Sequence, residues 1–281
     1  MTLERLSSSA LCTIQDNGRP GYRALGIPPA GAMDVMAMRL ANHLLNNQSN
    51  APVLECLAGA RFRVLRPTQI ALTGWGHACA WLTQPGEIVE ITAALSGVWH
   101  YIALPGGIDA PHWLRSASVC RRAGIDAAPE KDGRITGLGD PLGAWQTGIV
   151  RRYPTTPPAV TTENHTTPTA PIRVWPGPQW TQFPVRARKA FVTQAWQISP
   201  YSDRSGYRLE GESLAVPKEA LLSEPIRIGA IQVPPNGQPI VCLNDGPTVG
   251  GYPKIAVIDP SDLIRLMQSR PGSTVRFTLA S

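Results

Sequence analysis

Apolar residues in the first half of the chain follow one helical pattern and several strand-like patterns. Met36, Leu40, Leu44 and Leu45 recur at a helical spacing, which places them on one face of a helix. Asp34 stands just before this stripe, where its side chain can cap the helix, and the polar run 46–50 ends it. Apolar and β-branched runs predict strands at 69–73, 87–92 and 98–104.

The second half of the chain shows the same preference for short strands. Apolar runs predict strands at 226–233, 239–243, 254–258 and 274–279. One short helix is expected at 261–269, where Asp259 or Ser261 can cap the first turn. Many short strands with one helix in each half predict a mainly β fold, in the form of two β-barrel-like domains with a few short helices.

A stretch rich in proline and threonine divides the chain. Residues 154–171 read PTTPPAVTTENHTTPTAP, with five Pro, seven Thr and no apolar period. Such a composition is typical of an extended linker. We therefore predict an N-terminal domain over 1–153, a linker over 154–171 and a C-terminal domain over 172–281, each domain being of ordinary size.

Charge and cysteine content narrow the classes of function. The net charge is +6 and the pI about 9.3, but the basic residues are not clustered, so we expect no nucleic-acid partner. No apolar run reaches the ~18 residues of a membrane span, and the first residues lack the pattern of a signal peptide. We therefore expect a cytoplasmic protein without a membrane partner. The five cysteines lack a CxxC pair and predict buried thiols, while the five histidines show no ligand spacing and predict no metal site.

Residues 15–34, QDNGRPGYRALGIPPAGAMD, combine four glycines with Arg19 and Arg23. Glycine lets the backbone approach a ligand closely, and arginine offers paired donors to an anion. The segment is therefore a candidate binding loop. The alternative is a glycine-rich hairpin that leads into the helix capped by Asp34.

Residues 202–211, SDRSGYRLEG, place Arg204 and Arg208 four positions apart. In a strand the two side chains would share one face, because the side-chain period is two. They could then bind one anion. The alternative is a surface hairpin whose arginines are solvated.

Residues 229–254 hold the densest group of candidate residues. Gln232 and Gln238 flank a Pro-Pro-Asn-Gly turn, and a diglycine loop then precedes Tyr252 and Lys254. Lysine is scarce in this chain, and one beside a diglycine loop is a candidate for contact with a carboxylate, phosphate or carbonyl group. The alternative is that these residues only pack and shape the loop.

Taken in order, these segments resemble one family over nearly the whole chain. It is the carboxyltransferase-like family that includes the C subunit of prokaryotic 5-oxoprolinase, the KipA-type proteins and the second half of the urea carboxylase carboxyltransferase domain, also called allophanate hydrolase subunit 2. The matching motifs of the first half are TIQDNGRPGYRALGIPPAGAMD, APVLE, IALTG and YIALPGGIDAP. Those of the second half are IRVWPGPQW, SDRSGYRLEG, ALLSEP, GAIQVPPNGQPIV and GGYPKIAVI. Each motif alone is weak, and their common order is specific.

The resemblance implies two cyclophilin-like β-barrel domains and an obligate partner. The partner is the B subunit, or KipI-type chain, which forms the active cleft with this one, and a further A subunit completes 5-oxoprolinase. The implied reaction is the ATP-dependent opening of 5-oxoproline to glutamate, with ATP and Mg²⁺ as the nucleotide substrate and no bound prosthetic group. Because a lactam is a poor electrophile, phosphorylation of its oxygen would create a leaving group for water.

A site for such an intermediate needs donors for a carboxylate and a phosphate. On the strength of the resemblance, catalytic roles are assigned to Lys254, Tyr252 and Asp245. Substrate-binding roles are assigned to Arg19, Asp34, Arg204, Arg208, Gln232, Gln238, Thr248, Gly250 and Gly251.

The sequence departs from the family pattern in three of these segments. Residues 114–119 read LRSASV where a Gly-Ser-Arg-Ser-Thr-like stretch is usual, Pro247 and Val249 interrupt a usual Gln-Thr-Thr, and 28–30 read PPA where Ser or Thr is common. Proline removes a backbone donor, and loss of the glutamine removes an amide. Two alternatives therefore stay open. One is a KipA-type regulatory protein without turnover, and the other is a carboxyltransferase subunit that works with a separate biotin-carrying chain.

Overall fold

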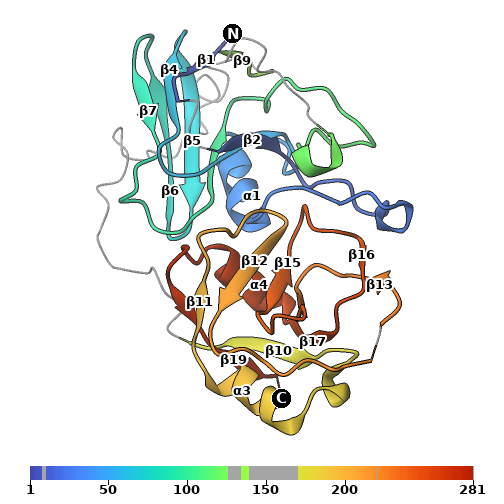
Figure 1. Cartoon of the computed structure of the whole chain (residues 1–281). Coiled ribbons are helices and arrows are strands. Elements are labelled where there is room, and N and C mark those ends of the chain that lie inside the picture. The colour runs from blue at the N-terminus through green and yellow to red at the C-terminus, as the bar shows by residue number, and fades with distance from the viewer. Residues whose placement is uncertain (8–10, 126–133, 139–169, 220, 281) are drawn as a thin grey trace. The chain divides into compact units, whose positions relative to one another are not determined.

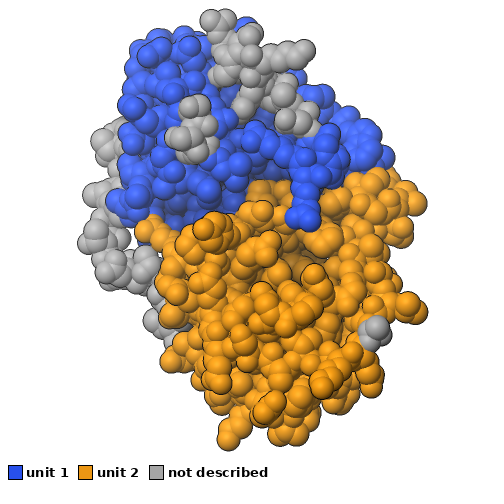
Figure 2. All heavy atoms as spheres, viewed as in Figure 1, with its two compact units in different colours: residues 1–19, 30–164 blue, residues 20–29, 165–281 orange. Residues whose placement is uncertain are grey.

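The computed structural model describes residues 1–7, 11–125, 134–138, 170–219 and 221–280 (Figure 1). Residues 154–169, most of the predicted linker, lie outside the described residues. The chain divides into two compact units, coloured separately in Figure 2. Unit 1 comprises residues 1–19 and 30–164, and unit 2 comprises residues 20–29 and 165–281. The segment 20–29 thus packs with unit 2 although residues of unit 1 flank it on both sides in the sequence.

Unit 1 contains two antiparallel sheets. The order of the five-stranded sheet is β2 (Cys12–Gln15), β3 (Val53–Cys56), β8 (His100–Ala103), β5 (Thr68–Gly74) and β6 (His77–Thr83). The order of the four-stranded sheet is β7 (Ile88–Glu90), β4 (Arg61–Val64), β1 (Leu3–Arg5) and β9 (Arg134–Ile135). The strands predicted at 69–73, 87–92 and 98–104 correspond to β5, β7 and β8. The described residues of this unit contain one 3-10 turn, η2 (Arg121–Ala123).

Helix α1 (Val35–Leu44) packs against β5 and β8 of unit 1. As predicted, the Asp34 side chain caps it by accepting a hydrogen bond from the Ala37 backbone N–H at 2.9 Å. Most of the predicted apolar stripe is not its buried face: Met36 and Leu40 are 63% and 41% exposed, whereas Leu45, the C-cap, is buried. The buried residues of α1 are Ala37, Met38, Ala41 and Asn42. The face toward the sheet thus combines small side chains with the single long side chain of Met38.

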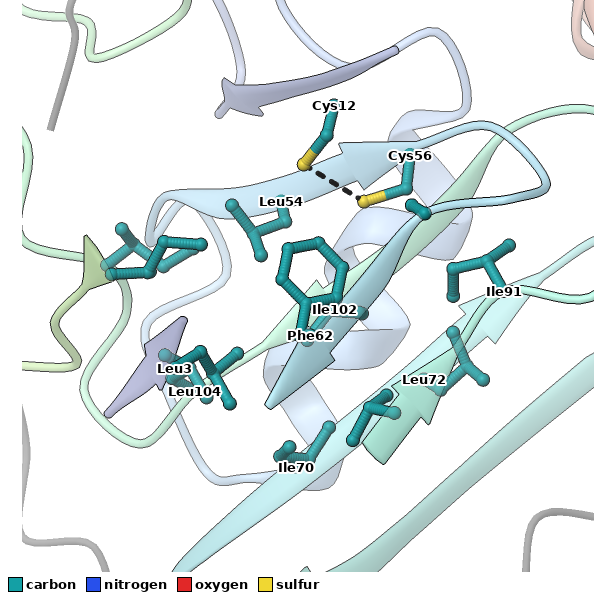
Figure 3. Packing of buried hydrophobic residues seen from close by; sticks show 14 of the residues in the cluster. Leu3, Cys12, Leu54, Cys56, Phe62, Ile70, Leu72, Ile91, Ile102 and Leu104 are labelled. Atoms are coloured by element: carbon teal, nitrogen blue, oxygen red, sulfur yellow. Dashed lines mark hydrogen bonds between the residues drawn. The ribbon is translucent and has the colours of Figure 1, made fainter. Parts of the chain in front are cut away.

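The two sheets of unit 1 share one hydrophobic core (Figure 3). Leu3 and Phe62 reach it from the four-stranded sheet, and Leu54 and Ile102 from the five-stranded sheet, all of them fully buried. Alternate residues of each strand point inward, so two sheets of short strands can bury a common apolar layer.

Cys12 and Cys56 lie opposite each other on β2 and β3, with their sulfur atoms 3.2 Å apart (Figure 3). Burial and the neighbouring thiol raise the pKa of Cys56 well above its usual value. All five cysteines are free and buried, as the sequence predicted.

Unit 2 is built around an eight-stranded sheet. Its order is β18 (Thr274–Val275), β11 (Trp196–Ile198), β12 (Gly206–Glu210), β15 (Ile240–Cys242), β14 (Ala230–Gln232), β17 (Lys254–Ile258), β10 (Ile172–Pro176) and β19 (Phe277–Leu279). The edge strands β18 and β19 are separated in sequence by Arg276 alone, so the sheet nearly closes into a barrel. The predicted mainly β fold is confirmed. One near-closed barrel is seen in unit 2, whereas unit 1 holds two separate sheets.

Smaller elements complete unit 2. They are the two-stranded ribbon of β13 (Glu224–Pro225) and β16 (Val249–Gly250), helices α3 (Val185–Thr193) and α4 (Pro260–Met267), and the 3-10 turns η1 (Arg23–Leu25) and η3 (Trp180–Gln182). The predicted strand 254–258 coincides with β17, and the predicted helix 261–269 corresponds to α4, which Asp259 caps. Helix α3 was missed because only Ala187 and Phe191 of its residues are buried, which leaves almost no apolar period. No helix in the described part of the chain is long and apolar enough to cross a membrane.

Candidate functional site

The candidate site of unit 2 joins the ribbon of β13 and β16 to the first residue of β17. Glu224 pairs with Gly250 across the ribbon. Lys254, which begins β17, donates a hydrogen bond from Nζ to Oε1 of Glu224, and the two side chains form an ion pair. The diglycine segment and Lys254, which the sequence placed together, are thus joined by an acidic residue that the sequence analysis did not select.

Gln179 holds both members of this pair. Its Oε1 accepts a hydrogen bond from the backbone N–H of Lys254 at 3.0 Å, and its Nε2 donates one to Oε1 of Glu224 at 2.8 Å. Gln179 is itself buried. One amide side chain therefore fixes the backbone of the lysine and the carboxylate that the lysine binds.

A close approach of two backbones places Gln179. A Cβ atom on Gly177 would lie 2.2 Å from the carbonyl oxygen of Lys254, so no other residue fits at 177 without displacement of the chain. The backbone N–H of Gly177 donates to the carbonyl oxygen of Ile255 at 2.9 Å. The Pro-Gly-Pro-Gln sequence at the end of β10 thus packs directly on β17.

The two members of the ion pair differ in exposure. The Lys254 side chain is 4% exposed, and that of Glu224 is 34% exposed. Hydrogen bonds from Lys254 and Gln179, together with the positive charge of Lys254, lower the pKa of Glu224, although partial burial opposes this shift. The Glu224 carboxylate is therefore ionised at neutral pH and lies toward solvent.

Gln232 supports the loop that precedes Lys254. Its Nε2 donates to the carbonyl oxygen of Tyr252 at 3.4 Å, and its Oε1 accepts from the thiol of Cys242 at 3.3 Å. Burial raises the pKa of Cys242 to about 11, although the positive charges of Arg23 and Lys254 oppose the rise. Gln232 is buried, so it supports this loop from the interior of unit 2.

The remaining predicted residues of the loop differ in accessibility. Thr248 is buried, and its carbonyl oxygen accepts from the backbone N–H of Ile226 at 2.9 Å. Gly251 is exposed, and Tyr252 is 46% exposed. A Cβ on Gly250 would lie 2.7 Å from Cδ1 of Ile226, so a side chain there would have to displace the end of Ile226. Gly250 is half-buried, and Gly251 and Tyr252 are the exposed members of this group.

Arg23 reaches the same region from far away in the sequence, on the segment 20–29 that belongs to unit 2. Its Nη2 donates to the carbonyl oxygen of Ile226 and, at 3.3 Å, to that of Pro247. Desolvation lowers the pKa of Arg23. The arginine thereby links the glycine-rich segment to the residue that follows β13 and to the loop that precedes β16.

Arg204 and Asp245 form a second ion pair in unit 2. The Arg204 Nε and Nη2 atoms each donate to a different oxygen of Asp245 at 2.9 Å, and both side chains are buried. Arg208 does not join them, because Arg204 precedes β12 and Arg208 lies within it, exposed. The expectation that the two arginines share one face is therefore wrong. The paired geometry favours a structural role for Arg204 and Asp245.

Gln238 ties two loops together at another place in unit 2. Its Nε2 donates to the carbonyl oxygen of Gly211 at 3.0 Å and to Oγ of Ser213 at 3.1 Å. Its Oε1 accepts from the backbone N–H of Gly211 at 3.1 Å. These amide bonds serve the fold, and none of them joins Gln238 to Lys254.

Two predicted substrate-binding residues, Arg19 and Asp34, belong to unit 1. Arg19 is buried, donates from Nη2 to the carbonyl oxygen of Ser118, and lies over the Trp113 ring at 5.6 Å from its centroid. The Asp34 side chain caps α1, and its backbone N–H donates to the hydroxyl of Tyr101. These contacts of the two residues serve the packing of unit 1.

The departure from the family pattern at 114–119 also has a structural use. Ser116 and Ser118 donate from their hydroxyls to Oδ1 of Asp16 at 2.6 and 2.5 Å. Leu114 and Arg115, at the start of this stretch, have positive φ values of 50° and 64°. Such values are sparsely populated by residues other than glycine, so the bonds to Asp16 hold a strained turn.

Two residues of the site were not predicted from the sequence: Glu224 and Gln179. Each lies in a motif that carried the family resemblance, namely ALLSEP and IRVWPGPQW, while Arg23 was named with the glycine-rich segment. The motifs were therefore the available signal, and only the fold shows that their polar side chains converge. No group of three or more His, Cys, Asp or Glu side chains suited to a metal occurs among the described residues.

The sequence of the chain matches the family model "carboxyltransferase domain, subdomain A and B" over residues 25–279. The chain therefore belongs to this carboxyltransferase family, as the resemblance predicted. It is 32% identical over 296 residues to the C subunit of 5-oxoprolinase from Haemophilus influenzae, and 34% identical over 298 residues to that from Escherichia coli. Each match covers 99% of this chain and 91% of the relative, so the chain is a homologue of the 5-oxoprolinase C subunit, part of an enzyme complex, over its full length.

Similar sequences also occur as parts of larger proteins. The chain is 29% identical to urea amidolyase of Lachancea kluyveri over 98% of its own length and 17% of that protein. The crystal structure of Kluyveromyces lactis urea amidolyase superposes with a TM-score of 0.77 at 27% identity, covering all of this chain and 19% of that one. The same fold thus occurs as one part of larger proteins.

Proposed function

We propose that this chain is the C-type subunit of an ATP-dependent 5-oxoprolinase-like amidohydrolase. With a B-type partner subunit it would form the active cleft, and with the A-type subunit it would open 5-oxoproline to glutamate. The observation that carries the proposal is the full-length similarity to two 5-oxoprolinase C subunits, at 32% and 34% identity. The Lys254–Glu224 pair in matching motifs supports it.

The chemistry requires an activated lactam. Transfer of the γ-phosphoryl group of ATP to the lactam oxygen activates the ring carbon, and a water molecule then adds to that carbon. The ring C–N bond breaks as the nitrogen takes up a proton, which leaves an acyl phosphate, and a second water hydrolyses this to glutamate and inorganic phosphate. ATP with Mg²⁺ is a substrate of the assembled enzyme in this proposal. We assign no Mg²⁺ ligands to this chain, since its described residues contain no cluster of three suitable side chains.

The proposed catalytic residues are Glu224 and Tyr252, with Lys254 and Gln179 as positioning residues. Lys254 and Gln179 keep the Glu224 carboxylate ionised and oriented. The half-exposed Tyr252 offers a hydroxyl beside the diglycine loop. Unit 2 is inferred to be a cyclophilin-like barrel, an inference supported by its near-closed eight-stranded sheet.

The test is 5-oxoproline-dependent ATP hydrolysis by this chain mixed with its own B-type and A-type partners. Activity is expected only when all chains are present, and the matched control omits this chain. An equal rate without it would refute the proposal. Lys254→Ala in the same mixture is expected to abolish turnover while leaving the complex assembled.

A regulatory role without turnover is the second candidate, and one observation favours it. Pro247 and Val249 interrupt the polar run next to the diglycine loop, and Val249 is 57% exposed in place of a polar residue. A KipA-type binding protein would form a stable complex with the B-type partner and show no substrate-dependent ATP hydrolysis. The assay above separates the two candidates. Activity that needs added biotin carrier protein would instead favour a carboxyltransferase.

A further inference from the structure

The Lys254–Glu224 pair presents its anion to solvent and keeps its cation inside. The lysine side chain is 4% exposed, while the glutamate side chain is 34% exposed. A buried ammonium that already donates to a carboxylate is a poor contact for an incoming anion. The group of this pair that a ligand can reach is therefore a hydrogen-bond acceptor.

The two oxygens of Glu224 are used unequally. Oε1 accepts the hydrogen bonds from both Lys254 Nζ and Gln179 Nε2. Oε2 accepts none from the described residues. An ionised carboxylate has about four acceptor positions, so Oε2 keeps its full capacity for a donor that comes from outside.

The surroundings of Glu224 leave this oxygen uncovered by side chains of the ribbon. Gly250 lies directly opposite on β16, and Gly251 follows it, so neither carries a side chain that could lie over the carboxylate. A Cβ on Gly250 would instead point toward Ile226 and Gln232. The ribbon is thus built so that the charged group is held from one side only.

We propose that Oε2 of Glu224 accepts a hydrogen bond from the N–H group of a lactam substrate. This assigns a ligand class to the site, a ring amide that carries its own N–H, and makes Glu224 the residue of the pair that touches substrate. The identity of the lactam as 5-oxoproline rests on the proposed function. Lys254 and Gln179 then act through Glu224 as positioning residues.

The experiment compares a lactam with the ring in which oxygen replaces the N–H. Dissociation constants for 5-oxoproline and for the γ-lactone of 2-hydroxyglutarate are measured by calorimetry, without ATP, on the complex of this chain with its A-type and B-type partners. The wild-type complex is expected to bind the lactam at least about tenfold more tightly, because the lactone ring oxygen faces a carboxylate and offers no donor.

Glu224→Gln is the decisive variant. A glutamine amide can accept from the lactam N–H or donate to the lactone oxygen, so the preference is expected to fall from about tenfold to near one. The matched control is Glu210→Gln, an exposed glutamate of the same unit, which is expected to keep the wild-type preference. An unchanged preference in Glu224→Gln would overturn the proposal.

A second variant covers a failure of Glu224→Gln to fold, since that change leaves Lys254 without its anion. Glu224→Asp keeps the charge and withdraws the oxygen by one methylene. It is expected to weaken lactam binding about tenfold and to leave lactone binding within about twofold. Equal weakening of both ligands would contradict a specific N–H contact.

Failure of the proposed function gives a different result. If the wild-type complex shows no ATP hydrolysis with 5-oxoproline, the same comparison is made with 2-pyrrolidinone and γ-butyrolactone. A preference for the N–H compound that disappears in Glu224→Gln would uphold the site and reject 5-oxoproline as its ligand. Equal binding of the two compounds by wild type would overturn the inference about Glu224.

Discussion

Among the described residues of unit 2, the buried cations Arg204 and Lys254 are each paired with a carboxylate, and the two carboxylates differ in exposure. Asp245 is 10% exposed at the side chain, and both of its oxygens accept from Arg204. Glu224 is 34% exposed, and only one of its oxygens is used by the described residues. Each pair joins one basic and one acidic residue, so residue type alone does not distinguish the pairs. The exposure of the anion therefore separates a pair that holds the fold from a pair that can serve a ligand.

Replacing the cation of each pair by methionine should reveal the difference between the pairs most strongly in the free energy of unfolding. Arg204→Met leaves the buried Asp245 carboxylate without its ion-pair partner and is expected to cost about 3–5 kcal/mol of unfolding free energy. Lys254→Met leaves Glu224, which water can solvate, and is expected to cost only about 1 kcal/mol. Urea unfolding of the two variants measures both values. Equal costs would mean that exposure does not distinguish the pairs.

Activity should reverse that order. Lys254→Met is expected to lower kcat/KM about 100-fold, or about 2.7 kcal/mol, because Glu224 loses the group that orients it and keeps it ionised. Arg204→Met should lose activity only in proportion to its unfolded fraction. Steady-state kinetics of the assembled complex, normalised to folded protein, tests this. A 100-fold loss per folded molecule in Arg204→Met would move that pair into the site.

Gln179 bonds to both members of the Lys254–Glu224 pair. Its replacement therefore tests how far this pair depends on a third residue. Gln179→Met deletes the acceptor of the Lys254 backbone N–H and the donor to Glu224. The expected cost is about 1–2 kcal/mol of unfolding free energy, since a buried backbone donor is left unpaired. Gln179→Glu, which restores the acceptor and adds a negative charge beside Glu224, serves as the control. Gln179→Glu is expected to regain less of the lost unfolding free energy at neutral pH, where its carboxylate is charged, than at low pH.

The sequence was enough for the outline of unit 2 and for the loop around Lys254. An apolar run predicted β17, and the Asp259 cap predicted α4, because local pattern decides such elements. The sequence pattern did not predict helix α3, because the helix buries only two residues and its stability comes from tertiary contacts. The apolar stripe of α1 gave the wrong face for Met36 and Leu40, because the helix packs on the sheet through Ala37, Met38 and Ala41 instead.

The site was harder to predict than the fold, for a physical reason. Lys254 and Glu224 are 30 residues apart, and Gln179 is 75 residues from Lys254, so their meeting depends on how β10, β13 and β17 are arranged. Gly177 shows the same point, since its lack of a side chain matters only where it meets the Lys254 carbonyl oxygen. Residue type marked Lys254 and Arg204 equally. Only burial and partners tell them apart.

The smallest expected effect is on acid sensitivity, and it follows from the pKa of Glu224. Lys254 and Gln179 lower this pKa below its ordinary 4.5. The contribution of the pair to stability is therefore complete above about pH 4.5 and is lost as the pH falls through the lower, folded-state value. In Lys254→Met the pKa should return toward 4.5, so the acid limb of kcat/KM should move to higher pH than in wild type. Because the Glu224 side chain is 34% exposed, salt should narrow this gap by screening. Coincident acid limbs in wild type and Lys254→Met would show that Glu224 does not titrate as the group that governs activity.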